Sequence, residues 1–380
     1  MKYLFFIFLA LLSVKVKFEN NIELIIDKVF QMLPGSDNFD IFKFSSEIKN
    51  DTLLIYKITD ISLNNLIGKN IKNQIVDKNK LKIFLLSLAD QYNLNTYPNI
   101  NPYHNIFHAS DVIHNLYLYL IQSKKYNPIL FTDTYIKQNE ELKVNSNINY
   151  KDLDIFALII AAACHDFKHT GRDNNFYLNY KDKVPFAKVL REYDYKLEYY
   201  HFAESKKLIE EFKILENLNN FQKERFYKIM KIAIYATDNS LNQKHIEDLI
   251  KYKNIMNMKS MNSTNEDFDK VKLIMFECYL HASDISNPTR NKELFIIWSD
   301  KINEEICEQS KEIHSFDKTK EIICVENDDK KFRDSGLLFF KNVIEIFFIP
   351  FCEIFEHLNY LCENYENNKK MLEGNEKIHI

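Results

Sequence analysis

Turn-forming residues are scarce in this chain. Its 380 residues include only 5 glycines and 7 prolines, far below the usual shares of about 7% and 5%. β-Sandwiches and β-barrels need frequent turns, so this scarcity argues against them. It favours long helices joined by polar loops, and we therefore predict an all-α fold.

An excess of one charge is also absent. The chain has 50 Lys+Arg against 54 Asp+Glu, a formal net charge of −4. Nucleic-acid binding needs a basic excess to neutralise phosphates, so we expect no nucleic-acid partner. A hydrophobic share of 46% with 27% charged residues is typical of a globular protein and not of a disordered chain.

No C-x-x-C pair occurs, and the cysteine spacing does not suggest disulfides. The six cysteines are Cys164, Cys278, Cys307, Cys324, Cys352 and Cys362, and most of them lie in apolar stretches. We expect buried, reduced thiols. Reduced thiols favour a reducing, intracellular setting, and hence a cytoplasmic catalytic domain.

One apolar run stands at the N-terminus, from Tyr3 to Val14, and it is flanked by lysines. It is shorter than the ~20 residues that span a bilayer, and no convincing small-x-small cleavage site follows it. Three interpretations stay open: an uncleaved signal, the tail of a longer membrane segment, or a buried helix. Membrane association through this segment is thus one hypothesis.

Apolar residues recur at helical spacing along most of the chain. The predicted helices cover 20–33, 79–92, 105–121, 153–165, 201–215, 221–236, 268–282, 292–309 and 341–362. Polar loops are expected over 122–151, 251–267 and 311–331. We expect a hydrophobic N-terminal segment over 1–19, a helical lead-in over 20–79, one helical domain over 80–362 and a frayed polar tail over 363–380.

Three segments combine histidine and aspartate. The first is Tyr103-His104-Asn105-Ile106-Phe107-His108-Ala109-Ser110-Asp111. If it is helical, His104 and His108 project from the same face, since they are four residues apart. Histidine pairs at this spacing are also common on surfaces, so this pair alone is weak evidence for a metal.

The other two segments are apolar helices that end in an acid. Residues 161–164 lead into His165 and Asp166, with His169 shortly after, and residues 278–283 lead into Asp284. A buried carboxylate needs a compensating partner, and a divalent cation or a local cap or salt bridge would serve. Two histidines and two aspartates suit a mixed N/O metal site. A bridging Asp would add a second ion such as Mg²⁺, and two-metal sites suit phosphoester hydrolysis.

In this order, Y-H-N-x-x-H-A-x-D, H-D-x-x-H-x-G-x-x-N-x-F and A-x-D-x-S-N-P resemble the class I 3′,5′-cyclic nucleotide phosphodiesterase catalytic domain. Supporting matches are Leu197-Glu198 with His201, Ala236-Thr237-Asp238, Trp298 and Glu304-Glu305. The resemblance covers most of residues 80–362. It implies a compact multi-helix catalytic domain with a metal site at the bottom of a pocket between helices.

The resemblance also assigns metal ligands by position. The tighter ion, commonly zinc in this family, would be held by His108, His165, Asp166 and Asp284. Asp166 would bridge to a second ion, usually Mg²⁺ or Mn²⁺. The waters of these ions would be held by His169, Glu198 and Thr237.

By the same resemblance, His104 matches the general acid that protonates the leaving 3′ oxygen, and Glu305 the carboxylate that orients it. An adjacent carboxylate keeps a histidine protonated at neutral pH. Substrate contacts are expected from Tyr103, Asn287, Ile302 and Phe339. The other histidines match no ligand, and we interpret His201 as structural.

The chain departs from the family where the purine is read. The family has a glutamine in S-Q-x-x-F, but here Ser335 is followed by Gly336. Aligned from Pro350 instead, Phe340 takes the glutamine position, so neither alignment restores an amide. We therefore predict weaker or less selective nucleotide binding. A second departure is Tyr200, where the family has the first of two histidines.

The resemblance implies an enzyme that hydrolyses cyclic AMP, cyclic GMP or both to the 5′-monophosphate in cyclic nucleotide signalling. A metal-bridged hydroxide would attack, with His104 as general acid. Two alternatives stay open: a nucleotide-binding regulatory protein with weakened catalysis, and a hydrolase of another phosphate ester. A purely structural helical protein would leave the three ordered motifs unexplained. The sequence gives neither purine preference nor oligomeric state.

Overall fold

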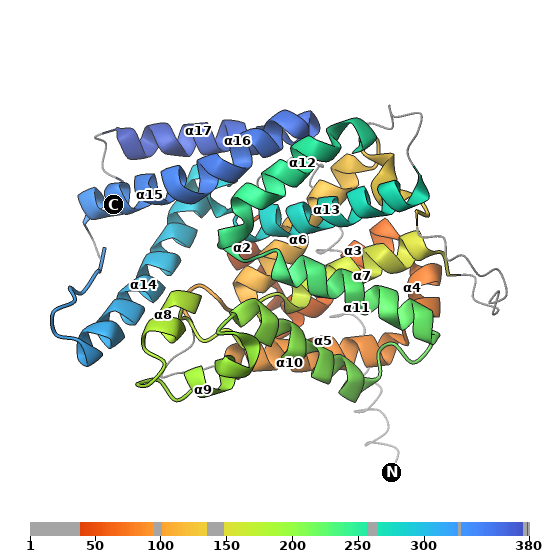
Figure 1. Ribbon diagram of the computed structural model, residues 1–380, viewed down its shortest axis with the longest axis horizontal. Helices are drawn as coiled ribbons and strands as arrows, with labels where there is room; N and C mark the ends of the chain where they lie inside the picture. Colours follow the sequence, from red (N-terminus) through yellow and green to blue (C-terminus); the bar gives the residue numbers. More distant parts are fainter. Residues whose placement is uncertain are drawn as a thin grey trace, which may run out of the picture.

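The chain folds as an assembly of α-helices (Figure 1). The computed structural model describes residues 39–94, 101–134, 148–256, 264–325, 328–374 and 378. No β-strand occurs in these ranges, so the predicted all-α fold is confirmed.

The first half of the described chain contains α2 to α9 and two 3₁₀ turns. The helices are α2 (Ile41–Ile48), α3 (Leu53–Leu66), α4 (Lys69–Ile75), α5 (Lys78–Leu94), α6 (Ile106–Ser123), α7 (Tyr150–Cys164), α8 (Asn174–Asn179) and α9 (Ala187–Leu190). The 3₁₀ turns of this half are η1 (Pro128–Phe131) and η3 (Arg191–Tyr193).

The second half contains α10 to α17. The helices are α10 (Leu197–Phe212), α11 (Asn220–Tyr235), α12 (Asn242–Met256), α13 (Asn265–Asp284), α14 (Lys292–Phe316), α15 (Asp329–Phe339), α16 (Glu345–Ile354) and α17 (Tyr360–Glu373). Between them lie η4 (Asn239–Leu241), η5 (Asn287–Thr289), a π-helical turn η6 (Phe340–Ile344) and η7 (Glu356–Leu358).

Local capping explains where several helices begin. The Asn105 side chain accepts a hydrogen bond from the Phe107 amide at the start of α6. Reciprocal capping boxes start α11, between Asn219 and Gln222, and α13, between Thr264 and Asp267. Two of these capped helices, α6 and α13, carry His108 and Asp284.

The C-terminal region differs from the expectation of one helix over 341–362. The π-helical turn, α16, η7 and α17 follow one another instead. The expectation of a frayed polar tail over 363–380 is also wrong, because α17 continues to Glu373 with Tyr365 and Leu372 buried. These two residues share one face of a helix whose residues after Cys362 are mostly polar, so overall composition hid the helix.

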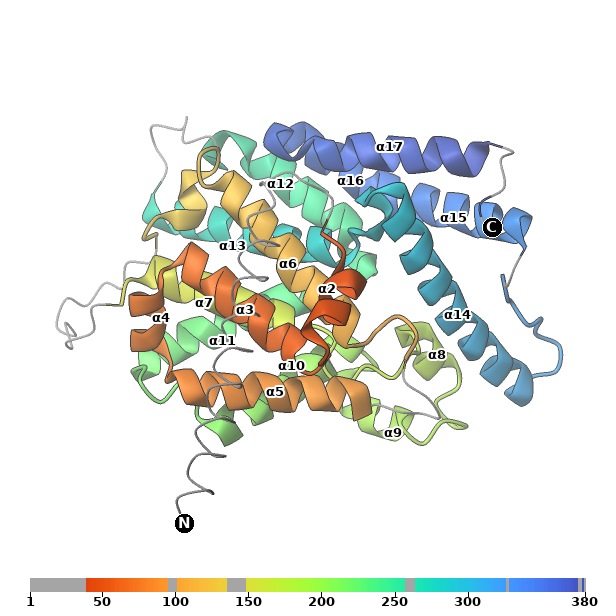
Figure 2. The ribbon, with the colours of Figure 1, turned by 180° about the vertical axis from the view of Figure 1, so that it is seen from behind.

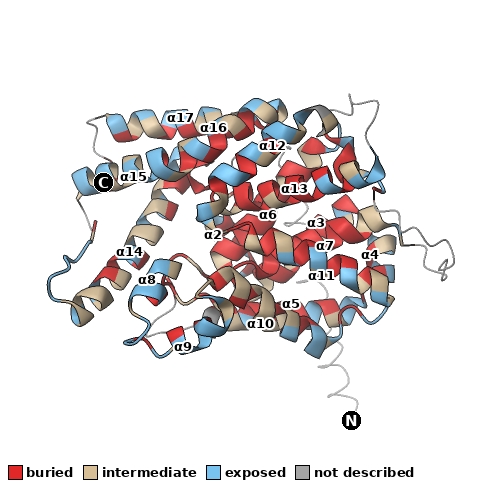
Figure 3. Cartoon of the chain, viewed as in Figure 1, coloured by how far each residue is buried: buried red, intermediate tan, exposed pale blue. Residues whose placement is uncertain are grey.

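The core surrounds α7, whose residues from Leu153 to Cys164 are all buried (Figure 3). This helix packs against α3, α6, α11 and α13. Viewed from behind, α2 and α3 lie against α6 (Figure 2). Phe44 and Leu54, which precede residue 80, belong to the same hydrophobic cluster as the later helices.

The cysteines correct the expectation of six reduced thiols. Cys307 is bonded to Cys324, and Cys352 to Cys362, whereas Cys164 and Cys278 are free and buried. The chain folds back after α14 and after α16, and this brings each pair together. Sequence spacing alone does not reveal such a return. Cysteine usage therefore no longer supports a reducing setting.

Within the described ranges, no helix has the length and apolar character needed to cross a membrane. The Tyr3–Val14 segment and the helix predicted over 20–33 lie outside the described residues.

A buried ion cluster joins three of the core helices. The Arg225 guanidinium on α11 contacts Asp154 of α7 at 2.8 and 2.9 Å and Asp269 of α13 at 2.8 and 2.6 Å. Lys272 of α13 lies 2.9 Å from Asp154. Asp154 thus compensates two buried cations, and its loss would leave both underpaired.

We expect Asp154→Ala to lower the free energy of unfolding by about 3–5 kcal/mol, the cost of breaking a buried ion pair from one side. Denaturant titration followed by circular dichroism measures this change. Asp152→Ala, in the first turn of the same helix, is the matched control and should change stability by less than about 1 kcal/mol. Equal losses in the two variants would contradict the assignment of Asp154 as the compensating charge.

Candidate active site

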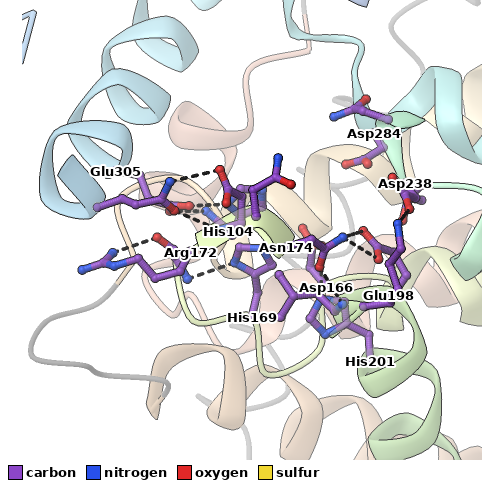
Figure 4. A pocket seen from close by; sticks show the side chains of 18 of the residues that line it. His104, Asp166, His169, Arg172, Asn174, Glu198, His201, Asp238, Asp284 and Glu305 are labelled. Carbon is purple, nitrogen blue, oxygen red and sulfur yellow. Dashed lines mark hydrogen bonds and ion pairs between the residues drawn. The ribbon is translucent and has the colours of Figure 1, made fainter. Parts of the chain in front are cut away.

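Four side chains converge where core helices begin or end. His108 lies in the first turn of α6, His165 caps the end of α7 with Asp166 next to it, and Asp284 is the last residue of α13. Helix ends suit this role because they hold a side chain firmly while leaving it room to face a cavity. Figure 4 shows Asp166 and Asp284 among the side chains that line that cavity.

The ligand atoms of these four residues lie within 4.8 Å of one another. The Nε2 atoms of His108 and His165 are 3.3 Å apart. Asp284 Oδ1 lies 2.9 Å from His108 Nε2 and 3.2 Å from His165 Nε2. Asp166 Oδ2 lies 3.3 and 3.1 Å from the same two nitrogens.

This spacing fits a single cation. Tetrahedral zinc with bonds of about 2.0–2.1 Å has ligand atoms about 3.3 Å apart. The His165 Nδ1 lies 2.9 Å from the Ala162 carbonyl oxygen and donates to it, which leaves the Nε2 lone pair free for a metal. The residues predicted as ligands thus form a group that could hold a divalent ion.

The two aspartates are ionised in these surroundings. Burial opposes their ionisation, but the imidazole of His165 holds the pKa of Asp166 and of Asp284 well below its usual range. Two buried negative charges at this separation call for compensation by positive charge.

His104 lies outside α6, which corrects the idea that it shares a helical face with His108. The helix begins at Ile106, and Asn105 caps it. Asn101 holds the turn instead, with its Nδ2 donating to the carbonyls of His104 at 3.1 Å and His169 at 2.7 Å. The ring centroids of His104 and His108 are still only 5.7 Å apart.

Glu305 of α14 fixes the position of His104. One carboxylate oxygen accepts from the backbone amides of Tyr103 and His104 at 3.2 and 3.1 Å, and the other pairs with His104 Nδ1. Burial alone would lower the pKa of His104, but Glu305 and Asp166 raise it to about 9. Burial would raise the pKa of Glu305, but His104 lowers it to about 2. The pair is therefore an imidazolium and a carboxylate at neutral pH.

Gly171 leaves room for Asn101 and Glu305, the two residues that hold His104 and its turn. Its φ is +72°, and a Cβ there would stand 2.8 Å from Asn101 Oδ1 and 3.4 Å from the Glu305 carboxyl carbon. A larger residue would be strained and would push against Asn101, which holds the turn that carries His104.

The residues predicted to hold metal waters line the same cavity. His169, Glu198 and Thr237 surround the space beside Asp166. The His169 ring stacks on His104, with centroids 3.8 Å apart. Burial and the nearby Asp238 carboxylate raise the pKa of Glu198 to about 7.

Sequence reasoning missed two residues of this group. His201 was read as structural, but its Nε2 is buried, has no hydrogen-bond partner among the described residues and lies 3.9 Å from Asp166 Oδ1. Asn174 donates to both Glu198 oxygens at 3.3 and 3.1 Å, and accepts from the Leu197 amide at 2.8 Å. The motif around His165 contained Asn174, and His201 stood among the supporting matches near Glu198, so a sequence signal existed for both.

Two adjoining cavities meet at His104 and Asp284. The first, of about 400 Å³, contains the polar residues beside Asp166. The second, of about 390 Å³, extends between α14 and α15 and includes all four predicted substrate contacts: Tyr103, Asn287, Ile302 and Phe339. Asn287 Nδ2 donates to the Tyr103 hydroxyl. The site thus has a charged half and a more apolar half, joined at the imidazolium.

Neither residue aligned with the family's glutamine offers an amide to the second cavity. A Cβ on Gly336 would meet Leu372 Cδ1 at 2.8 Å, so this position faces α17. Phe340 is 1% exposed and packs against Phe295 and Tyr365.

Such a site can bring a cation, a proton donor and a partly apolar ligand together. The comparisons with known proteins point the same way. The sequence pattern of the family described as 3′5′-cyclic nucleotide phosphodiesterase matches residues 103–365.

Curated relatives carry related names. The chain is 28% identical over 288 residues to the probable 3′,5′-cyclic-AMP phosphodiesterase pde-4 of Caenorhabditis elegans, covering 74% of this chain and 36% of that protein. It is 27% identical over 228 residues to the mouse (Mus musculus) dual specificity calcium/calmodulin-dependent 3′,5′-cyclic nucleotide phosphodiesterase 1C, covering 59% of this chain and 27% of that protein. The chain thus spans about a third of the length of these relatives.

A solved structure shows the same fold. The phosphodiesterase domain of the rhodopsin phosphodiesterase of Salpingoeca rosetta aligns with a TM-score of 0.68 at 20% identity, covering 92% of this chain and 93% of that one. The family pattern spans all the helices that bring the four converging side chains together. On these grounds the chain belongs to the 3′,5′-cyclic nucleotide phosphodiesterase family.

Proposed function

We propose that this chain hydrolyses a 3′,5′-cyclic nucleotide to the 5′-monophosphate. The observation that carries the proposal is the placement of His104 between a cluster of side chains that could hold a divalent cation and a partly apolar cavity. A cyclic nucleotide has the matching layout, with a charged phosphodiester at one end and a flat base at the other.

We assign His108, His165, Asp166 and Asp284 as ligands of a first ion, with Asp166 shared by a second. Zinc suits the mixed nitrogen and oxygen donors of the first position, and Mg²⁺ or Mn²⁺ the oxygen-rich second. When bound, such a pair polarises the phosphoryl oxygens and activates water. His169, Glu198 and Thr237 would orient waters around it.

His104 is assigned as the proton donor to the leaving 3′ oxygen. Its Nδ1 is paired with Glu305, so the proton on Nε2 is the one available for transfer to the leaving oxygen. Glu305 keeps the ring charged and fixes its plane. Tyr103, Asn287, Ile302 and Phe339 would place the sugar and base, because they line the second cavity.

A nucleotide-binding protein with weakened catalysis is the second candidate. The observation that favours it is the lack of an amide at Gly336 and Phe340. The two candidates differ in turnover and not in binding, so a kinetic measurement separates them.

Asp284→Asn should weaken metal binding, because it removes one of two anionic ligands. Second-sphere losses alone cost about 10- to 100-fold in affinity, so we expect a loss of at least about 100-fold for this ligand. Chelator competition followed by elemental analysis measures the affinity. Asp248→Asn on α12 is the control and should retain the metal; equal binding by both variants would remove Asp284 from the site.

His104→Asn should reduce the turnover of cyclic AMP and cyclic GMP by at least about 100-fold, the usual contribution of a positioned proton donor. Its metal content should match that of the unchanged protein. Turnover is followed by product chromatography with added Mg²⁺ or Mn²⁺. His314→Asn, on α14 and outside both cavities, is the control.

Undiminished turnover in His104→Asn would remove His104 from the mechanism. No turnover of either nucleotide by the folded, metal-loaded wild-type chain would favour the binding protein.

Glu305→Gln should move the alkaline limit of turnover to lower pH. A proton donor works below its pKa and fails as the pH rises through it, and Glu305 helps to raise the pKa of His104 to about 9. Without that carboxylate, burial lowers the pKa, and we expect the limit to fall by at least about one pH unit. Glu304→Gln, an exposed neighbour, should leave the pH profile unchanged. A limit that does not move in Glu305→Gln would contradict this role.

A further inference from the structure

One face of α14 forms a wall of the second cavity. Its residues recur at helical spacing and comprise Phe295, Trp298, Ser299, Ile302, Asn303 and Ile306. The opposite wall comes from α15 and the turn after it, and includes Ser335 and Phe339. Most of the facing groups are apolar, so the few polar ones decide which ligand edge is accepted.

Asn303 and Ser335 join the two walls through a hydrogen bond. The Ser335 hydroxyl donates to Asn303 Oδ1 at 3.2 Å. No partner of Asn303 Nδ2 is recorded in the described part of the chain. The serine therefore sets the direction of the carboxamide and leaves its N–H groups for a ligand.

The other amides of this cavity are not equivalent. Asn287 Nδ2 is engaged with the Tyr103 hydroxyl. Asn239 is exposed and also lines the charged cavity. Asn303 is absent from the lining of the charged cavity and stands one residue from Ile302, so it belongs to the base end of the site.

We propose that Asn303, oriented by Ser335, reads position 6 of the purine and favours a 6-oxopurine cyclic nucleotide. This inference rests on the proposed function. Nδ2 donates to the oxygen at position 6 of guanine or hypoxanthine. The amino group of adenine is itself a donor and meets another donor there, while one of the two lone pairs of Oδ1 is already taken by Ser335. The Asn303 amide on α14 thus reads the purine, which the residues Gly336 and Phe340 cannot do.

The test compares kcat/KM for four 3′,5′-cyclic nucleotides: those of guanosine, inosine, adenosine and unsubstituted purine riboside. Losing one hydrogen bond changes binding by about tenfold. We expect the wild-type chain to prefer inosine over purine riboside, and guanosine over adenosine, by about that factor. Asn303→Leu should bring both ratios close to one by raising KM, with kcat nearly unchanged.

Ser335→Ala is the second variant, and it keeps the amide. It should reduce the guanosine-to-adenosine ratio, because the carboxamide is then free to turn and offer its oxygen to adenine. Glu304→Leu, an exposed neighbour on α14, should leave all ratios unchanged.

A wild-type chain without a 6-oxo preference, or an Asn303→Leu variant that retains it, would overturn the proposal. If the wild-type chain turns over none of the four, the proposed hydrolysis has failed separately. Displacement of a fluorescent cyclic nucleotide by the same four ligands then decides. The 6-oxo preference must appear in wild-type binding and vanish in Asn303→Leu. Any other result rejects the proposal that Asn303 recognises position 6 of the purine.

Discussion

Two carboxylates, the buried Asp166 and the partly buried Asp284, lie against the same pair of imidazole nitrogens, and much of this architecture serves to hold them there. Charges removed from water are costly unless compensated. The ends of α7 and α13 therefore have to meet precisely placed partners, and the rigid core supplies that placement. The Arg225 cluster locks these two helices to α11. That internal cluster is already neutralised by the cations Arg225 and Lys272, whereas the two carboxylates at the cavity are paired only with histidines among the described residues.

Sequence reasoning worked best where a feature is local. Asp166 and Asp284 end strongly apolar helices, and such an abrupt change of polarity is visible without any structure. Helix periodicity located α6, α7, α11 and α13 to within a few residues. The pairing of His104 with Glu305 spans 201 positions, so no local pattern contains it. Only resemblance to a family suggested that contact in advance.

The failures have physical causes too. Cys307 and Cys324 meet because the chain returns after α14, and return paths depend on tertiary packing. The helix α17 is polar on most of its surface, so its buried Tyr365 and Leu372 were outweighed by its composition. The disulfide error concerns where segments meet, whereas the α17 error concerns which segment forms a helix.

The division of the site into two halves bears on how the chain departs from its family. The proposed metal ligands and His104 come from helices α6 and α13, from the end of α7 and from the turn before α6, all anchored in the core. The second cavity, proposed to take the base, is lined by one face of α14 and by α15, which packs against α17. Substitutions at Gly336 or Phe340 therefore alter the contacts of α15 with its neighbours, while the distances among His108, His165, Asp166 and Asp284 are set elsewhere. Glu305 is the exception, because it comes from α14 and yet orients His104. A change that displaced α14 would disturb both halves, so substitutions in the second cavity are best tolerated at side chains such as Asn303 that line it and can change without moving the helix.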